Sequence, residues 1–515
     1  MQLLRKQTFD TRIFLTLICF AFLVFVLSSD GHRYTFDEDV TIQQNLWIST
    51  MSPHPDFIQG ESQIFFNYPE YFPNNLRAIC LNGILCSGIE IGAAIIQVPF
   101  LLLNQNFHFI TPDTLFLTID DFPDPHYVFW RNSLPPDFTF VELFFGPTFA
   151  ALSVGIFYLI SRSYGLTSST ALILSIFYGF TTPVWAYSQT SLNIVPAVFF
   201  ILLGFLFFRK FLNNSSTLQL TLSGITLGFA FLVRNDMIFV IGPIFIFFVF
   251  HFIKKSNKIK NAISLIIPLI GSYAIKRAVD YIKTGDYTYI TSTALVTPQT
   301  NISHISNIFG MLFSPGVGLF IFTPILFTTI ISFVDFFKHN RSETILFISM
   351  LILPLLIFSN GNSWHGLGAW AERYLYFIIP FLLFPLGFSI EKRQNKVFRI
   401  VLVGLGFLGV IVNLSYIVTD VSWFIWGLMG SGRGLYELGS IATALWVHPL
   451  VLWTFEYSQL FHALRYPFVS FYPDIYLLKV WGPYFYSLFS IISLGMFTSI
   501  LVWLNRKSSL ISKTH

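Results

Sequence analysis

Residues 139–161 read TFVELFFGPTFAALSVGIFYLIS, a run with a single charged side chain. About 20 apolar residues in helical conformation cross the hydrocarbon core of a bilayer, so this run predicts a membrane span. Further apolar runs of helical length lie at 13–28, 168–185, 192–208, 218–233, 237–253, 261–278, 316–334, 343–359, 373–390, 398–418 and 484–504. The pattern predicts an all-α integral membrane protein of about 12 transmembrane helices.

The composition supports the same class. Of the 515 residues, 54% are hydrophobic and only 11% are charged, whereas soluble proteins devote about a quarter of their residues to charge. Lipid must therefore be the solvent for most of the surface. The net charge of +4 is small and neither nucleic-acid binding nor a polybasic tail is indicated.

The charges between the runs predict the orientation. Short cytoplasmic loops collect Lys and Arg, and with both termini in the cytoplasm 19 of the 30 Lys and Arg lie in short inner segments, while 22 of the 26 Asp and Glu lie outside. This topology leaves a large extracytoplasmic loop at 29–138 and a second at 419–483. A protein with most of its non-membrane chain on one face is expected to act on that face, here outside the cell membrane.

Two shorter apolar stretches, 89–103 and 441–455, leave the topology partly open. Each is 15 residues long and contains a polar interruption, which is short for a span. We expect both to be re-entrant or interfacial segments. The alternative is that both cross the membrane.

Acidic residues follow the first predicted span directly, in SSDGHRYTFDEDV (28–40). Asp37 and Glu38 lie beside the membrane, where a carboxylate could take a proton from a hydroxyl while a lipid-borne substrate is held at the surface. Apolar residues that include Val40, Trp47 and Met51 then form a stripe suited to an interfacial helix. The alternative is a solvated loop without a function.

A second candidate lies in WHGLGAWAERYLYFIIPF (364–381), where Arg373 falls at the outer end of a predicted span. The planar guanidinium offers a fork of donors that suits phosphate. Arg373 could instead only extend to the interface, or Glu372 could neutralise it.

Arg234 and Asp236 occupy a tight outer turn between two apolar runs. Charges so near the hydrocarbon are costly unless they are paired or functional. The two residues either form a pair or serve a substrate.

Other motifs give less. His32, His54, His108 and His126 accompany acids in the first outer loop, which leaves a divalent metal ion open as a cofactor, but no HExxH spacing occurs and we predict no metal ligand. Walker and GxSxG motifs do not occur either, so nucleotide-driven transport and serine-hydrolase chemistry lose support.

Five stretches together resemble the GT-C superfamily of glycosyltransferases, in particular the polytopic proteins similar to protein mannosyltransferases. They are YTFDEDV (34–40), YGFTTPVWAYSQT (178–190), DYIKTGDY (280–287), MLFSPGVGLFIFTPILF (311–327) and WHGLGAWAERYLYFIIPF (364–381). The sequence departs from the family pattern at Ala371-Glu372, where relatives often have Gly-Pro, and at Leu367, where a second Gly is common.

The resemblance implies a catalytic module at 1–400, followed by C-terminal spans at 401–515. It implies a polyprenyl-phosphate sugar as donor, Asp37 as general base, and Glu38 as its neighbour or acceptor ligand. Arg373 and Tyr374 match the arginine-tyrosine that would hold the donor phosphate. Arg234 and His365 are expected to assist them.

The predicted function is transfer of a sugar, with inversion, to a hydroxyl of a protein, lipid or glycan at the extracytoplasmic membrane surface. The alternative is a transporter or flippase of a lipid-linked or polar substrate. A transporter should carry polar residues near the bilayer midplane, whereas these charges cluster at the outer boundary.

Overall fold

The structure is a computed structural model of the whole chain. It describes residues 2–31, 41, 44–45, 47–49, 77–79, 85–87, 89–110, 136–252, 258–287, 304–361, 364–366, 369–393, 395–419, 449–469 and 473–513. The predicted base Asp37 and its neighbour Glu38 lie outside these residues, and so do half of the predicted interfacial helix after them and most of 441–455.

The described chain is almost entirely helical. Its first half contains α1 (Gln2–Leu27), α4 (Ile91–Phe107), α6 (Pro136–Ser163), α7 (Ser168–Phe180), α8 (Val184–Tyr187), α9 (Ile194–Asn214), α10 (Thr217–Val233), η4 (Asn235–Met237) and α11 (Ile238–Phe252). The second half contains α12 (Lys258–Thr284), α13 (His304–Phe313), α14 (Leu319–Phe322), α15 (Leu326–His339), α16 (Arg341–Phe358), η6 (Arg373–Ile378), α17 (Ile379–Lys392), α18 (Lys396–Ile417), α21 (Pro449–Trp453), α22 (Gln459–Val469) and α23 (Tyr476–Lys513). Among the described residues, the one departure from an all-α fold is a short antiparallel pair of strands, β1 (Arg77–Ile79) and β2 (Leu85–Ser87), with Arg77 opposite Ser87.

Eight helical segments are long and apolar enough to cross a membrane, which confirms a polytopic membrane protein. They coincide with eight of the predicted spans. Three other predicted runs form apolar helices of 13 to 17 residues, and the 89–103 stretch forms the helix α4.

The predicted span at 316–334 is not one helix. Thr323 has non-helical backbone angles, φ −132° and ψ 67°, between α14 and α15. Pro324 follows it, and the residue before a proline is pushed out of the helical region. The predicted run 168–185 is likewise divided, since α7 ends at Phe180 and α8 begins after Pro183.

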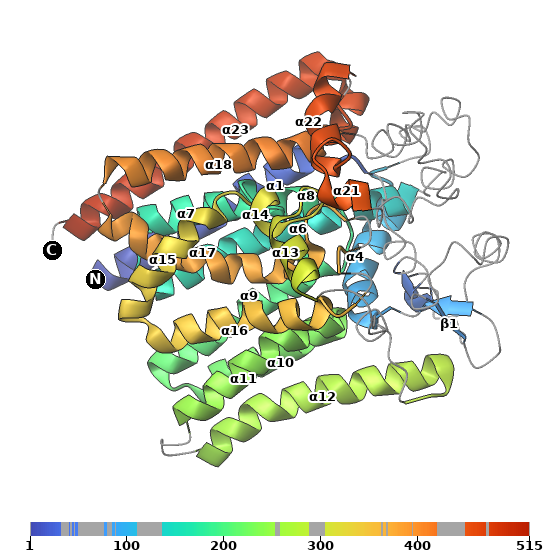
Figure 1. Cartoon of the computed structure of the whole chain (residues 1–515), viewed down its shortest axis with the longest axis vertical. Helices are drawn as coiled ribbons and strands as arrows, with labels where there is room; N and C mark the ends of the chain where they lie inside the picture. The colour runs from blue at the N-terminus through green and yellow to red at the C-terminus, as the bar shows by residue number, and fades with distance from the viewer. Residues whose placement is uncertain are drawn as a thin grey trace.

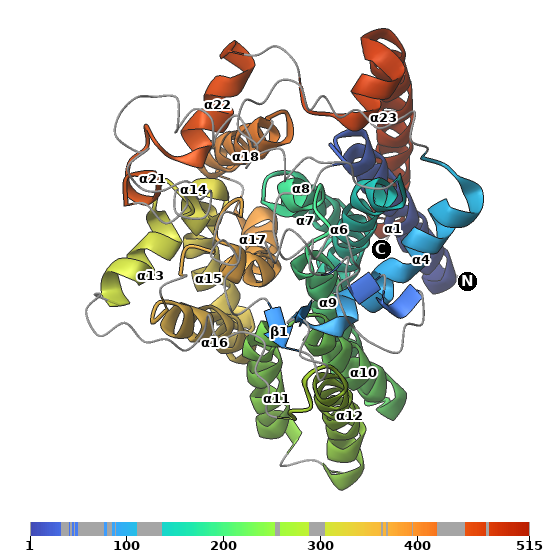
Figure 2. The same cartoon turned by 90° about the vertical axis from the view of Figure 1, so that its right-hand side faces the viewer.

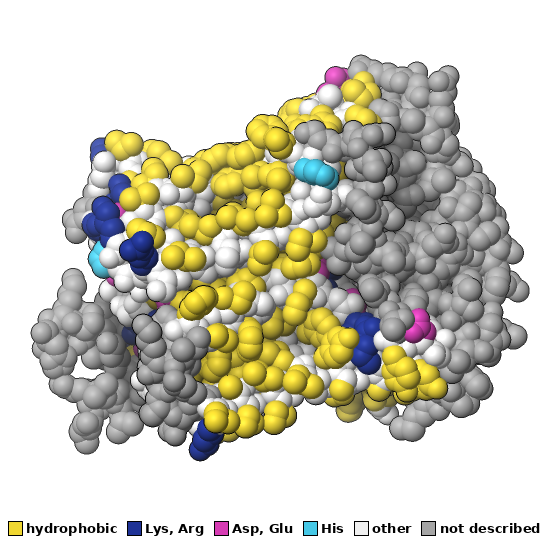
Figure 3. All heavy atoms as spheres, turned by 60° about the horizontal axis from the view of Figure 1, so that its bottom comes forward, with side chains coloured by type: hydrophobic (Ala, Val, Ile, Leu, Met, Phe, Trp, Pro, Cys, Tyr) yellow, Lys and Arg dark blue, Asp and Glu magenta, His cyan; other side chains and the backbone are white. Residues whose placement is uncertain are grey.

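The helices form a bundle with both chain ends at the same end of it (Figure 1). Viewed along the bundle, α6, α9 and α17 lie toward the centre (Figure 2) and are mostly buried, whereas α12, α18 and α23 are mostly exposed. Large apolar side chains on the outer helices face outward, with Phe407 66% and Ile491 71% exposed. Figure 3 shows such side chains as a broad band with Lys and Arg toward its margins, as lipid contact requires.

Ion pairs connect helices within this apolar bundle. Charges near hydrocarbon are retained when they are paired, because an unpaired charge loses its hydration without compensation. The pairs join α1 to α6 through Asp10 and Arg162 (2.9 Å), α15 to α17 through Asp335 and Arg393 (2.6 Å), and α9 to α16 through Arg209 and Glu343.

The connection between α7 and α9 packs directly against α6. Gly146 makes this possible, because a Cβ at that position would lie 2.4 Å from the carbonyl oxygens of Ser188 and Thr190. Those oxygens belong to backbone and cannot rotate away as a side chain could. The position of the 184–193 segment, which carries site residues described below, therefore depends on a glycine in α6.

We predict that Gly146→Ala destabilises the protein by about 1–3 kcal/mol, as overpacking against backbone does. The matched control is Gly271→Ala in α12, where nothing lies within 4 Å of the added Cβ and the better helix propensity of alanine should stabilise slightly. Thermal unfolding in detergent measures both. Equal midpoints for the two variants would contradict the close-approach argument.

Candidate active site

Arg234 lies in the turn between α10 and α11 and is 8% exposed. Its Nε donates to both carboxylate oxygens of Asp236 at 2.7 Å, and its NH1 donates to Oδ1 of Asn193 at 3.0 Å. The pairing alternative for Arg234 and Asp236 is therefore confirmed. These hydrogen bonds fix the orientation of the guanidinium and join it to Asn193, at the start of α9.

Arg373 begins η6 and is also 8% exposed. Its ring neighbour is Tyr374, 5.4 Å from the guanidinium carbon to the ring centroid. The Tyr374 ring stacks on Phe358 of α16 at 4.3 Å. Packing against a stacked aromatic pair restricts the orientations open to the Arg373 side chain.

Glu372 precedes Arg373 and is buried. Its Oε1 accepts the N–H of Tyr374 at 3.2 Å, and its Oε2 is buried with no hydrogen-bond partner among the described residues. Burial raises the pKa of Glu372 well above its ordinary value, although the Tyr374 N–H and the Arg373 charge act in the opposite direction. This environment favours the neutral acid, which does not cancel the charge of Arg373 as a carboxylate would.

The structure brings the predicted phosphate ligands together. Arg234 and Arg373 lie close enough for their charges to interact, and Tyr187 lies within the electrostatic range of both and of Tyr374. Two guanidinium groups from distant parts of the sequence therefore lie near each other.

Tyr187 is a site residue that the sequence analysis missed, although it lies within the YGFTTPVWAYSQT stretch. Its ring packs on Tyr376 at 4.6 Å, and its hydroxyl is buried without a hydrogen-bond partner among the described residues. Burial raises the pKa of Tyr187, so the phenol keeps its proton and can donate it to an acceptor.

His365 is linked to Arg373 by its neighbour Gly366, which packs against the Arg373 side chain. The next residue, Gly366, has φ +74°, and a Cβ there would lie 3.0 Å from Cγ of Arg373. His365 itself is 2% exposed. The predicted assistant to Arg373 therefore belongs to the loop that packs against the arginine side chain.

The chain before Asp37 is anchored to the same region. Trp185 donates its indole N–H to Oγ of Ser28 at 2.9 Å, and the Gln189 amide donates to the Ser28 carbonyl. The backbone N–H of Tyr476 donates to the Ser29 carbonyl at 2.9 Å. The C-terminal end of α1 is thus held by the segment that carries Tyr187.

The chain after Glu38 is anchored there too. Asn45 donates to Oε1 of Gln97 in α4 at 2.5 Å, and Gln97 donates to the Ser191 carbonyl at 3.0 Å. The Ser191 N–H and hydroxyl donate in turn to Glu142 of α6, at 3.0 and 2.7 Å. Both flanks of the acidic motif therefore meet the 184–193 segment.

The described residues contain no group of three or more His, Cys, Asp and Glu placed to hold a metal ion. His32, His54 and His126 lie outside those residues.

Ala371 has φ +59°, in the left-handed region that glycine adopts most readily. We predict that Ala371→Gly stabilises the protein by about 0.5–1 kcal/mol. Glycine removes the cost of holding alanine in the left-handed conformation, and part of this gain is lost because glycine increases the entropy of the unfolded chain. Ala369→Gly, at an ordinary backbone conformation two residues earlier, is the control and should destabilise. Thermal midpoints in detergent compare the two, and a lower midpoint for Ala371→Gly would show that the strain is absent.

Residues 131–279 match the family model described as dolichyl-phosphate-mannose-protein mannosyltransferase, and this segment contains Tyr187 and Arg234. No sequence among the curated proteins matches the chain. Among solved structures, the chain is similar to ArnT from Cupriavidus metallidurans in the apo state, with 10% identity, a TM-score of 0.46 and coverage of 88% of this chain and 77% of that one. It is also similar to the archaeal oligosaccharyltransferase AglB from Archaeoglobus fulgidus in complex with an inhibitory peptide and a dolichol-phosphate, with 12% identity, a TM-score of 0.43 and coverage of 84% and 60%. The family match agrees with the resemblance seen in the sequence, and residues 131–279 are similar to the dolichyl-phosphate-mannose-protein mannosyltransferases.

Proposed function

We propose that the protein transfers a sugar from a polyprenyl-phosphate donor to an acceptor hydroxyl on the extracytoplasmic face of the cell membrane. The observation that supports this proposal is the proximity of Arg234 and Arg373, beside the segment that anchors both flanks of the acidic motif. A lipid phosphate is the anion that a membrane-embedded cationic site would meet.

The proposed donor site has three components. Arg373, packed by Tyr374, supplies positive charge, and Arg234, oriented by Asp236 and Asn193, supplies guanidinium N–H donors. The buried hydroxyl of Tyr187 supplies a neutral donor. Prearranged donors in a site shielded from water stabilise developing phosphate charge more strongly than they would in bulk solvent.

The proposed reaction is a single displacement. Asp37 takes the proton of the acceptor hydroxyl, whose oxygen attacks the anomeric carbon from the side opposite the phosphate. The bond from that carbon to the phosphate oxygen breaks, its electron pair leaves with the polyprenyl phosphate, and the configuration inverts. Glu38 lies next to the base and would orient the acceptor, while His365 would support Arg373.

The proposal includes the finer topology. The three shorter apolar helices and the interrupted 316–334 segment complete about 12 crossings, both termini are cytoplasmic, and residues 1–400 form the catalytic module. Residues 401–515 add further spans and the 419–483 loop. The matching family model names a dolichyl-phosphate mannose donor and a protein acceptor, and a lipid or glycan hydroxyl would suit the same chemistry.

Transport of a lipid-linked or polar substrate without chemistry is the competing function. It requires no general base, so replacing Asp37 separates the two functions.

We predict that Asp37→Asn lowers the rate of transfer by about 10²- to 10⁴-fold, as loss of a general base does, with little change in donor binding. The assay measures polyprenyl phosphate released from a polyprenyl-phosphate hexose by protein in nanodiscs, with a cell-envelope extract as acceptor. Asp39→Asn, within the same acidic run, is the control and should retain activity. A wild-type rate in folded, donor-bound Asp37→Asn protein would end this assignment.

We predict that Arg373→Met weakens donor binding by about 10- to 100-fold, because it removes hydrogen bonds to a charged group worth about 1.5–3 kcal/mol. Arg373→Lys should fall between, since it keeps the charge but loses the planar fork. Binding of a fluorescent polyprenyl monophosphate measures both, and Arg399→Met, at an exposed position of α18, is the control. Equal affinity in Arg373→Met and the wild type would remove Arg373 from the site.

A further inference from the structure

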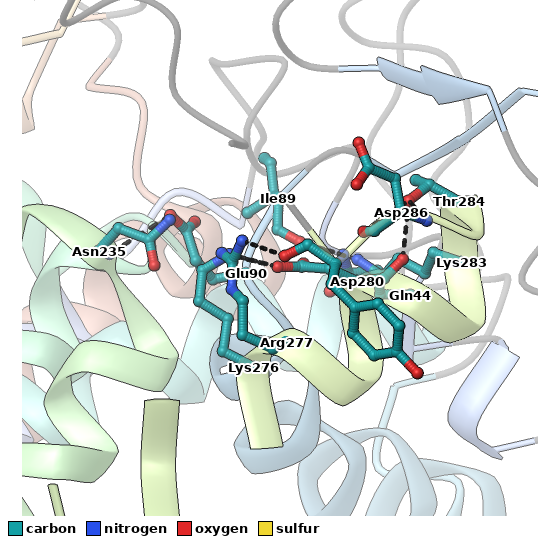
Figure 4. Close-up of polar contacts among 11 residues, drawn as sticks. Gln44, Ile89, Glu90, Asn235, Lys276, Arg277, Asp280, Lys283, Thr284 and Asp286 are labelled. Carbon is teal, nitrogen blue, oxygen red and sulfur yellow. Dashed lines mark hydrogen bonds and ion pairs between the residues drawn. The ribbon is translucent and has the colours of Figure 1, made fainter. Parts of the chain in front are cut away.

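A second polar group adjoins the Arg234 turn and includes Asn235, the residue after Arg234. It consists of Glu90, Asn235, Lys276, Asp280 and Lys283, which we call the Glu90 cluster (Figure 4). Its members come from the start of α4, from η4 and from α12. None of them belongs to the donor site described above.

Glu90 is held close to Arg234 by backbone packing. It directly precedes α4, and a Cβ on Gly92 would lie 2.5 Å from the Leu232 carbonyl carbon and 2.6 Å from the Val233 nitrogen. The first turn of α4 therefore rests on the last turn of α10, which is followed directly by Arg234.

The Glu90 side chain does not cap its own helix. It occupies the N-cap position of α4 but forms no cap hydrogen bond there, although an N-cap side chain commonly binds an amide of the first turn. Instead, its Oε1 accepts the backbone N–H of Asn235 at 3.3 Å. The carboxylate thus binds the residue that links Arg234 to Asp236.

The neighbouring peptide is held from two further directions. The Ile89 carbonyl accepts from Nζ of Lys283 at 3.0 Å and from the Gln44 amide at 2.6 Å. In α12, Asp280 pairs with Lys276 at 2.8 Å and with Arg277 at 2.9 Å. The position of Glu90 is therefore set by α12 and by the segment that follows the acidic motif.

The charges around Glu90 also connect it to the donor site. Burial raises the pKa of Glu90, while Lys276 and Arg234 favour its ionised form and Asp236 opposes it. Glu90 therefore lies within the electrostatic range of the Arg234–Asp236 pair and of α12.

We propose that Glu90 is a positioning residue of the donor-phosphate site, which holds the Arg234 turn in place through the N–H of Asn235 and connects it to α12. The inference rests on the proposed function, because it assumes that Arg234 binds the donor phosphate. Glu90 acts on the backbone of the turn and does not itself contact the phosphate. Its loss should let the turn relax and weaken donor binding while the base and acceptor remain in place.

The test compares Glu90→Ala with Glu90→Gln, whose amide oxygen can still accept the Asn235 N–H. For Glu90→Ala we expect the donor KM and the Kd for a fluorescent polyprenyl monophosphate to rise about 10-fold, as loss of one hydrogen bond to a charged group allows, with kcat within about 2-fold. Glu90→Gln should recover most of the affinity. A residue with a role only in folding would lower the active fraction and leave KM unchanged.

The matched control is Glu391→Ala. Glu391 also accepts a backbone N–H through its carboxylate, from Thr167 at 2.6 Å, but at an exposed position at the end of α17. It should leave donor affinity unchanged. Unchanged affinity in Glu90→Ala, or a loss in kcat alone, overturns the inference.

The same binding assay separates the two proposals. Absence of polyprenyl monophosphate binding in the wild type would overturn the proposed donor site itself. Loss of binding in Arg234→Met and Arg373→Met together with full binding in Glu90→Ala would leave the donor site standing and remove only the role of Glu90.

Discussion

The buried pair of Arg234 and Asp236 is the interaction on which the organisation of the site depends. A charge in a low-dielectric environment needs a partner because it has lost its water. The pairs Asp10 with Arg162 and Asp335 with Arg393 meet this need between helices and so hold the bundle together. Arg234 and Asp236 are two residues apart on one turn, so their pairing joins no helices and mainly fixes the direction of a cation.

The surroundings of Arg373 solve the same electrostatic problem differently. Its sequence neighbour Glu372 would cancel its charge if it were ionised, but burial favours the protonated carboxyl. The left-handed conformation of Ala371 accompanies this arrangement. A strained backbone at a candidate site is retained when its surroundings over-determine it, and here the Tyr374 N–H bond to Glu372 and the packing of Gly366 on Arg373 do so.

The sequence predicted the membrane class and the eight longest spans, because apolar length is a local signal. It also singled out Arg234 and Arg373 as candidate site residues, because isolated charges near apolar runs are visible in the sequence. It did not predict the division of the 168–185 and 316–334 runs, since hydrophobicity continues through Pro183 and Pro324 while helical geometry does not. Tyr187, Glu142 and Glu90 were missed for another reason. Their roles depend on partners about 50 to 190 residues away, as between Glu142 and Ser191 or Tyr187 and Arg373, and one sequence carries no signal for such contacts.

The interruption at Pro183 connects these observations. In a continuous helix through 168–185, the polar side chains would project in all directions around the helix axis. No segment would then cross the end of the bundle. Because the helix stops, the 184–193 segment lies over α6 beside Gly146 and presents Tyr187 to the arginines, Gln189 to Ser28 and Ser191 to Glu142. The 184–193 connection thus positions the residues proposed to bind phosphate relative to the two flanks of the acidic motif. The proposed chemistry therefore requires the break in the apolar run.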